Sequence, residues 1–256
     1  MTSSSRGVFP FGRPVQACPP SASDHRRVVV VGAYPSALHV SWTPPEPYRR
    51  IQAIAVENEP EPFWTGNDQA AKVEAWKKAV GFDPERWGTI SPAGALNGSS
   101  GGWVDENVLT PLGITRADAW ITDSLDTYRC SEDLAARLAD TYNPFAKNAG
   151  LSEAILLEHP SENDIVREAL QDHQPRLRDE FAAAAPDLIV TLGNAALAVV
   201  RDLLPRSGGA DTRRLSASEQ YGSVVRVRLG QRDVDLLPLA HPAAPAVYQE
   251  AHKRWR

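Results

Sequence analysis

Residues 27–32 read Arg-Val-Val-Val-Val-Gly, a run of β-branched side chains that ends in glycine. Such an uninterrupted apolar run is typical of a strand buried on both faces, as in a parallel sheet covered by helices. A second apolar run, residues 187–192, is followed by Gly193-Asn194 and by a stretch to Leu204 that predicts a helix. A strand, a glycine turn and a helix in succession indicate an α/β fold.

Further strands and helices are expected on both sides of these runs. Strands are expected at residues 50–56, 119–122, 223–229 and 234–239, and helices at residues 67–80, 132–142, 162–185 and from Ala246 onward. We expect Asn67 or Asp68 to cap the first helix and Pro175 to interrupt the third. Residues 88–102 read as a loop. The alternation predicts a three-layer α/β/α fold with a largely parallel central sheet.

Length and composition are those of an ordinary globular protein, with 256 residues of which 42% are hydrophobic and 23% charged. We expect residues 1–26, rich in Ser, Pro and Arg, to form an irregular arm and residues 27–256 to form one α/β domain. The sequence shows neither an apolar run of membrane-spanning length nor a signal-peptide core. We therefore expect a cytoplasmic protein without a membrane partner.

The cysteine and charge content narrows the function classes. Two cysteines, Cys18 and Cys130, are too few for a disulfide framework or for a cysteine-bound zinc or iron–sulfur site, so we expect no cofactor and no metal. The net charge of −5, from 27 Lys and Arg against 32 Asp and Glu, argues mildly against non-specific coating of nucleic acid. A locally basic face that binds a few phosphates is still compatible with this net charge.

Four expected strands end in residues that can carry chemistry. The segments are Gly32-Ala33-Tyr34-Pro35-Ser36, Glu57-Asn58-Glu59-Pro60, Asp123-Ser124 and His241-Pro242-Ala243-Ala244-Pro245. Functional groups collect at the carboxyl ends of strands in open α/β sheets, so we expect these segments to meet. Each also has an ordinary interpretation on its own, such as a tight turn, or a helix cap for Asp123 or His241.

Four side chains suit a site for a planar ligand. Phe63 and Trp64 lie between two turn-forming residues, and aromatic faces stack well on nucleic-acid bases; the alternative is that one or both rings fill the core. His241 can donate a hydrogen bond to negative charge that develops on a ligand. Asp123 follows an apolar strand, and a buried carboxyl needs a partner, which a ligand can provide.

Taken in order, the motifs resemble the uracil-DNA glycosylase superfamily, and most closely its thermostable iron–sulfur branch. The matching segments are Gly32 to Pro35, Pro62 to Gly66, Ile121-Thr122-Asp123, Val190 to Leu197 and His241-Pro242-Ala243. They correspond to the family's Gly-x-x-Pro turn, Pro-Phe-x-Gly-like element, Ile-Thr-Asn strand end, Val-x-Leu-Gly-x-x-Ala-Leu segment and His-Pro-Ser/Ala motif. Five elements in the correct order, across about residues 27–256, are far more specific than any one motif.

The resemblance implies a monofunctional DNA glycosylase, a hydrolase that flips a base out of DNA and cuts its N-glycosidic bond. The residues that it implies are Tyr34, Ser36, Phe63 and Asp123 for the base, Gly32, Ala33 and Pro35 for the wall of the pocket, and His241 for stabilising the leaving base. We expect phosphate contacts from the amides of Ala243 and Ala244 and from Lys253, Arg254 and Arg256; solvated cations are the alternative for the last three. DNA is the expected partner of a monomeric protein.

The chain departs from the family at several positions. Ala33 and Tyr34 stand where the first motif usually has an Asp, Asn or Glu. We therefore expect Glu57 or Glu59 to position water, unless leaving-group stabilisation alone suffices. The cluster cysteines are missing apart from Cys130, and the loop between residues 37 and 60 is longer than in the iron–sulfur branch.

Two further departures bear on the substrate. Asp123 replaces the base-reading Asn, and a protonated Asp can donate to the bare N3 of cytosine and accept from its amino group. Ser36 stands where well-known uracil enzymes have a tyrosine that blocks substituents at C5. We therefore expect a 5-modified cytosine, hydroxymethylated or glucosylated as in phage DNA, and a role in antiviral defence.

Three other functions fit the sequence. They are a uracil or hypoxanthine repair glycosylase, a catalytically inactive DNA-binding relative, and a sugar-nucleotide or nucleoside enzyme on the same layered fold. A Schiff-base lyase step is not expected, because none of the motifs contains a lysine.

Overall fold

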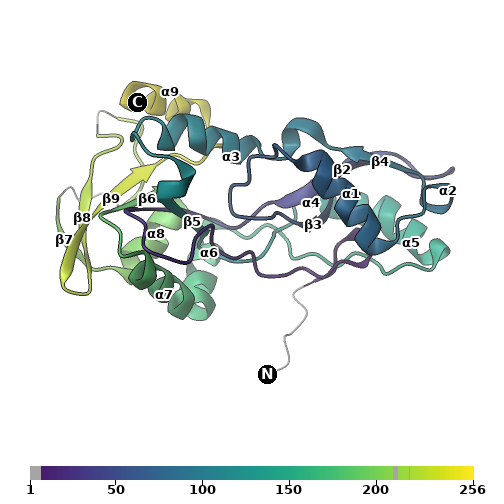
Figure 1. The fold of residues 1–256 in the computed structure, drawn as a ribbon, viewed down its shortest axis with the longest axis horizontal. Helices are drawn as coiled ribbons and strands as arrows, with labels where there is room; N and C mark the ends of the chain where they lie inside the picture. The colour runs from purple at the N-terminus through teal and green to yellow at the C-terminus, as the bar shows by residue number, and fades with distance from the viewer. Residues whose placement is uncertain (1–6, 210–212, 219) are drawn as a thin grey trace.

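Two β-sheets organise the chain, and Figure 1 shows them in opposite halves of an elongated molecule. The structure is a computed structural model that describes residues 7–209, 213–218 and 220–256. The larger sheet has six strands in the order β5-β1-β6-β9-β8-β7, and the smaller has three in the order β3-β2-β4. The helices of the described residues all fall short of the length and apolar character that a membrane crossing requires.

The six-stranded sheet is mostly parallel. Its strands are β5 (Ala119–Asp123), β1 (Val28–Gly32), β6 (Leu188–Leu192), β9 (Arg232–Leu239), β8 (Val225–Leu229) and β7 (Arg206–Gly209). The first four run parallel, and β8 and β7 add antiparallel pairs at one edge. The register pairs Gly32 with Asp123 and Leu192 with Leu239, so the carboxyl ends of the parallel strands form one edge.

Helices cover both faces of this sheet. One face carries α6 (Glu162–Glu168), α7 (Gln174–Ala184) and α8 (Asn194–Leu203), and the other carries α3 (Ser99–Val104) and α9 (Ala246–Trp255). The side chains of β1 alternate between the two layers: Val29 and Val31 join one core, and Val28 and Val30 the other. The three-layer α/β/α fold with a largely parallel central sheet is therefore confirmed.

The three-stranded sheet is antiparallel and has a hydrophobic core of its own. It consists of β3 (Ile51–Asn58), β2 (Ala37–Thr43) and β4 (Thr89–Pro92). Its core takes side chains from α1 (Gln69–Val80), α2 (Pro84–Trp87), α4 (Glu132–Arg137) and α5 (Asn143–Ala149). Phe9 and Phe11, around the 3-10 turn Pro10–Gly12, also pack into it, so the segment before β1 is fixed to this half of the molecule.

Two segments expected to be loops contain regular structure, which corrects the sequence-based prediction. The connection between residues 37 and 60 contains β2, and β2 pairs with β3, which therefore lies outside the central sheet. Residues 88–102 contain β4 and the start of α3. A Cβ at Gly101 would lie 2.1 Å from the carbonyl oxygen of Phe63. Close packing on that backbone thus requires glycine there, despite its low helix propensity.

The expected helix boundaries are close to the observed ones. Asp68 precedes α1, but its carboxylate accepts a hydrogen bond from Trp64 Nε1 at 2.9 Å instead of capping the helix. A π-helical turn at Ala169–His173 precedes α7, and Pro175 lies in the first turn of that helix. The interruption expected at Pro175 is therefore confirmed.

Candidate functional site

A cavity of about 560 Å³ lies where the carboxyl edge of the central sheet faces the small sheet. From the central half it is lined by Ala33 to Ser36 after β1, Asp123 at the end of β5, Leu192 to Ala195 after β6, and His241 and Ala243 after β9. From the other half and the connecting loops come His39, Glu59, Phe63, Tyr128, Arg129 and His159. All four segments that the sequence singled out thus contribute to one cavity.

Gly32 lies beneath two candidate base contacts, just outside the residues that line the cavity. A Cβ at this residue would lie 2.1 Å from Asp123 Oδ1 and 2.6 Å from the Phe63 ring. Gly32 itself is buried and pairs with Asp123 in the β1–β5 register. The close approach of the Phe63 ring and the Asp123 carboxyl therefore depends on the missing side chain at residue 32.

Phe63 and Trp64, the adjacent aromatics, have different surroundings. The Phe63 ring lines the cavity, whereas Trp64 packs into the core of the small sheet. Phe63 has a φ of 55°, in the left-handed region that is rare for non-glycine residues. Its carbonyl accepts a hydrogen bond from Arg116 Nη2 at 2.5 Å, which holds the strained backbone in place. One of the two rings is thus available for stacking on a base.

The carboxyl of Asp123 is buried at the end of β5 with an exposed fraction of 3%. Among the described residues, neither of its oxygens has a hydrogen-bond partner. Burial raises the pKa of Asp123 well above its ordinary value, and the nearby Glu59 carboxyl raises it further, while Arg176 opposes both. This direction of the pKa shift favours the protonated carboxyl, which can both donate and accept a hydrogen bond.

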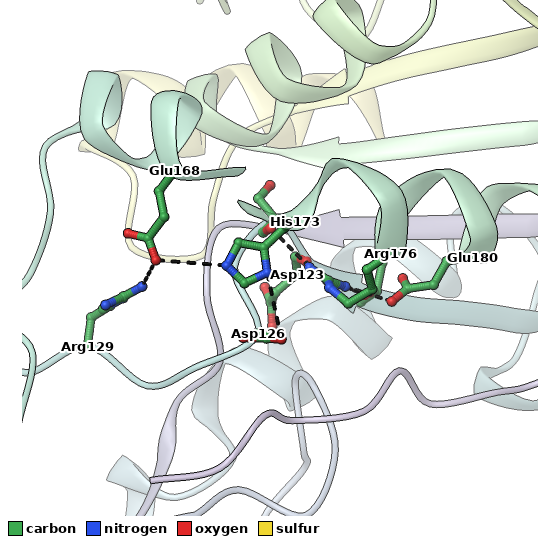
Figure 2. Close-up of polar contacts among 9 residues, drawn as sticks. Asp123, Asp126, Arg129, Glu168, His173, Arg176 and Glu180 are labelled. Carbon is green, nitrogen blue, oxygen red and sulfur yellow. Dashed lines mark hydrogen bonds and ion pairs between the residues drawn. The ribbon is translucent and has the colours of Figure 1, made fainter. Parts of the chain in front are cut away.

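Arg176 of α7 fixes the backbone that carries Asp123 (Figure 2). Its Nη2 donates to the carbonyl oxygens of Asp123 and Ser124 at 2.8 and 3.0 Å, and its Nη1 donates to Thr122 Oγ1 at 3.2 Å. Glu180, one helical turn along α7, forms an ion pair with Nη1 at 2.6 Å. These bonds leave little freedom for the end of β5.

A second buried polar group supports the loop after β5, as Figure 2 also shows. The side chain of His173 lies between two carboxylates, 3.6 Å from Asp126 Oδ2 and 3.8 Å from Glu168 Oε1. Glu168 also pairs with Arg129, whose side chain is buried and lines the cavity. The loop that presents Tyr128 and Arg129 is thus fixed to α6 and to the π-helical turn after it.

The ring of His241 is held in one orientation after β9. Its Nδ1 accepts a hydrogen bond from the backbone N–H of Ala243 at 3.1 Å, so the neutral ring carries its proton on Nε2. Burial lowers the pKa of His241, and the neighbouring His159 lowers it further. Gln249 of α9 donates to the carbonyl of Pro242 at 2.9 Å, which fixes the turn. His241 is therefore a neutral donor at neutral pH.

Glu57 and Glu59 differ in their surroundings. Glu59 is buried in the cavity wall, where its Oε1 accepts the backbone N–H of Ser36 at 2.7 Å. Burial raises the pKa of Glu59 to about 8, although backbone N–H groups, that of Ser36 first among them, act in the opposite direction. Glu57 lies outside the cavity lining and pairs with Arg13, whose Nε donates at 2.7 Å. Of the two carboxyl groups, only that of Glu59 belongs to the described lining of the cavity.

The expected phosphate contacts are not assembled as a group. The amides of Ala243 and Ala244 donate to Nδ1 and to the carbonyl oxygen of His241 in this structure. Lys253 pairs with Glu250 at 2.7 Å. Lys253 and Arg254 lie about two helical turns from the start of α9 and outside the cavity lining.

Several residues that line the cavity were not predicted from the sequence. His39 lies on β2, where residues 37–60 read as a loop, and burial lowers its pKa to about 4. His159 contacts the edge of the Tyr34 ring, with ring centroids 5.2 Å apart. The available signal was a histidine between apolar neighbours at residues 38–40. Over the part of the chain that the structure describes, no three His, Cys, Asp or Glu side chains gather as metal ligands.

Comparison with known families gives one match. The family model described as Uracil DNA glycosylase superfamily matches residues 65–256. No curated protein matches the chain significantly. The matched part contains Asp123 and His241, whereas β1, His39 and Phe63 precede it.

Proposed function

Since the chain belongs to the uracil DNA glycosylase superfamily, whose members bind DNA and excise bases, we propose that it removes a 5-substituted cytosine from DNA. The observation that carries the proposal is one cavity that brings together the buried carboxyl of Asp123, Phe63 and a neutral His241. This set offers a stacking face, a reader of the base edge and a donor for the leaving group.

A protonated Asp123 can bind the edge of cytosine. A protonated carboxyl donates through its hydroxyl and accepts through its carbonyl oxygen, which complements the bare N3 and the amino group of cytosine. Uracil has an N3–H and the O4 acceptor at these places, which a protonated carboxyl also satisfies when its two oxygens exchange roles, so the preference for cytosine rests on the room at C5.

The cavity has room for more than a pyrimidine ring. Its volume of about 560 Å³ lies within the range of pockets that enclose drug-sized ligands. Ser36 is exposed in the turn after β1, where the resemblance implies room for a C5 substituent. Unmodified cytosine occurs throughout cellular DNA, so an enzyme of this kind must require the substituent. Hydroxymethylated or glucosylated cytosines of phage DNA meet this requirement, and we propose a role in antiviral defence.

In the proposed reaction the N-glycosidic bond breaks heterolytically. Both electrons leave with the base, and the sugar passes through an oxocarbenium-like state. The Nε2–H of His241 donates to the cytosine O2, where negative charge develops. The ionised form of Glu59, the minor form at neutral pH because its pKa is about 8, accepts a proton from the water that attacks C1′, and the departed base takes up a proton from solvent. Within the described part of the chain, the residues that line the cavity include no lysine, which supports a monofunctional enzyme.

An excision assay on single-base oligonucleotides tests the proposal. Duplexes would carry one uracil, hypoxanthine, cytosine, 5-hydroxymethylcytosine or glucosylated 5-hydroxymethylcytosine, and alkali would cleave any abasic site. We expect strand cleavage with a 5-substituted cytosine and none with cytosine. Excision of uracil or hypoxanthine alone would identify a repair glycosylase, and DNA binding without cleavage would identify an inactive relative.

A further inference from the structure

A series of buried hydrogen bonds connects the residue before His241 to α9. The backbone N–H of Ala240 donates to Tyr221 Oη at 2.7 Å. Tyr221 Oη lies 2.7 Å from His252 Nδ1, and His252 Nε2 lies 2.7 Å from the carbonyl oxygen of Asn107. Tyr221, Ala240 and His252 are all buried. Three hydrogen bonds thus connect α9 and the turn at Asn107 to the residue before His241.

The proton positions along this series follow from its two ends. The Ala240 N–H occupies one lone pair of Tyr221 Oη, so the hydroxyl hydrogen is left to donate to His252 Nδ1. His252 Nε2 faces a carbonyl, which can only accept, and must carry the ring proton. The neutral Nε2–H tautomer of His252 satisfies every group, and burial lowers the pKa of His252 in agreement with a neutral ring.

The imidazole of His252 cannot easily shift out of this arrangement. Its ring centroid lies 4.9 Å from that of Trp103 on α3 and 5.1 Å from that of Trp255 on α9. The Tyr221 ring approaches it at 5.8 Å with an interplanar angle of 79°. Three aromatic neighbours therefore hold the histidine that orients the Tyr221 hydroxyl.

Ala240 is the first residue after the backbone pairing of β9 with β6 ends. The β6–β9 register ends at Leu239, and the carbonyl of Leu239 accepts the N–H of Gly193. The next backbone N–H, that of Ala240, is bonded by Tyr221 instead. The peptide that sets the starting direction of His241 is therefore oriented by a side-chain hydroxyl.

We propose that Tyr221 and His252 are positioning residues for His241, which they act on through the Ala240 peptide. The proposal rests on the proposed role of His241 toward the leaving base. Misplacement of a catalytic group by about 1 Å can cost on the order of 100-fold in rate, so loss of the hydroxyl should reduce the chemical step. DNA binding should be unaffected, because Tyr221 and His252 lie outside the cavity lining.

The test compares Tyr221→Phe with a matched buried tyrosine in the other half of the molecule. Tyr142 Oη also accepts a backbone N–H, that of Phe11 at 2.5 Å, and its residue is fully buried. We expect Tyr221→Phe to lower the single-turnover excision rate about tenfold or more at unchanged Kd for DNA. Tyr142→Phe should leave the rate unchanged for a similar fall in Tm. Equal rates in both variants would overturn the proposal.

A double-mutant cycle separates positioning from general loosening of the fold. In a His241→Ala background, Tyr221→Phe should cost little further activity, because the group that it positions is gone. A full tenfold loss in that background would show that the hydroxyl acts elsewhere, and would overturn the proposal.

Amide hydrogen exchange provides a readout that does not depend on activity. Tyr221→Phe should speed exchange at the Ala240 amide and leave the amides of β1 and β5 protected. Unchanged protection of Ala240 would overturn the proposal. A wild type that excises none of the five bases would count against the proposed function, while the exchange result would still decide whether Tyr221 orients this peptide.

Discussion

The two halves of the molecule contribute to the cavity in different ways. The central half supplies Asp123 and His241, and each of them follows a strand whose end is bonded by a side chain from a covering helix or loop. The small-sheet half supplies Glu59 and a set of rings and polar side chains, such as His39, from strands of an independent core. We therefore expect the rate of the chemical step to depend on the central half. The small-sheet half should decide which substituent on the base is accepted.

Removing the imidazole of His241 should have the largest effect and would show whether the central half carries the chemistry. We expect His241→Ala to lower single-turnover excision about 10²- to 10³-fold, as for the loss of one preorganised donor to developing negative charge. DNA affinity, measured by fluorescence anisotropy, should stay within about twofold. His25→Ala, remote from the cavity lining, serves as the control. Near-normal excision by His241→Ala would refute the assignment.

Changing the base reader should redirect the enzyme rather than inactivate it. The amide in Asp123→Asn keeps one donor and one acceptor, and it is the group that the resemblance implies for reading uracil. We expect about 10- to 100-fold lower excision of the modified cytosine and a gain on uracil. Competition between the two substrates in one reaction measures the ratio directly. A variant that loses both activities equally would mean that Asp123 does not read the base.

Glu59 lies between the two halves, and its titration should appear in the stability of the protein. Its pKa of about 8 in the folded state lies above the ordinary value of 4.5, so the folded state holds a proton that the unfolded state releases. Stability should therefore fall as the pH rises from about 4.5 to 8. Glu59→Gln should flatten this fall in a series of thermal melts.

Glu57→Gln is the matched control for that series, because Glu57 pairs with Arg13 outside the cavity. We expect its melting profile to follow that of the wild type. A Glu59→Gln profile with the wild-type slope would mean that Glu59 is not held protonated by its surroundings.

We expect the smallest effect from His39→Leu in the small-sheet half. This variant tests whether that half sets which C5 substituent is accepted. This change removes a polar ring from the wall and keeps an apolar side chain on β2. We expect relative rates for hydroxymethylated and glucosylated cytosine to change by about fivefold, near 1 kcal/mol. Thr43→Val, at an exposed position of β2, should change neither rate. An equal loss on both substrates would argue against a role in selectivity.

The central half could be predicted from the sequence because its signals are local. Residues 28–32 and 188–192 are apolar runs whose side chains are buried on both faces, and their strand ends carry Tyr34 and Asn194. Asp123 and His241 could be placed in one site from the rule that the carboxyl ends of parallel strands share an edge.

The sequence of the small-sheet half contains weaker signals for its strands and site residues. β4 has only four residues, none of them fully buried, and pairs at an edge through contacts that no local pattern reveals. His39 could not be assigned to the cavity without the pairing of β2 with β3. Arg129 and Arg176 depend on partners about 40 and 50 residues away, Glu168 and Asp123. Such distant pairs are set by tertiary packing, which periodicity and motifs do not report.

The bare backbone at Gly32 has a consequence for how this site can change over evolutionary time. Any side chain there would overlap both the Asp123 carboxyl and the Phe63 ring, which lie within 2.1 and 2.6 Å of its first atom. The reader of the base edge and the stacking face are thus joined at one position of the chain. Descendants of this protein can exchange residue 123 or residue 36 to meet a new base, but they inherit residue 32 unchanged or lose the pocket.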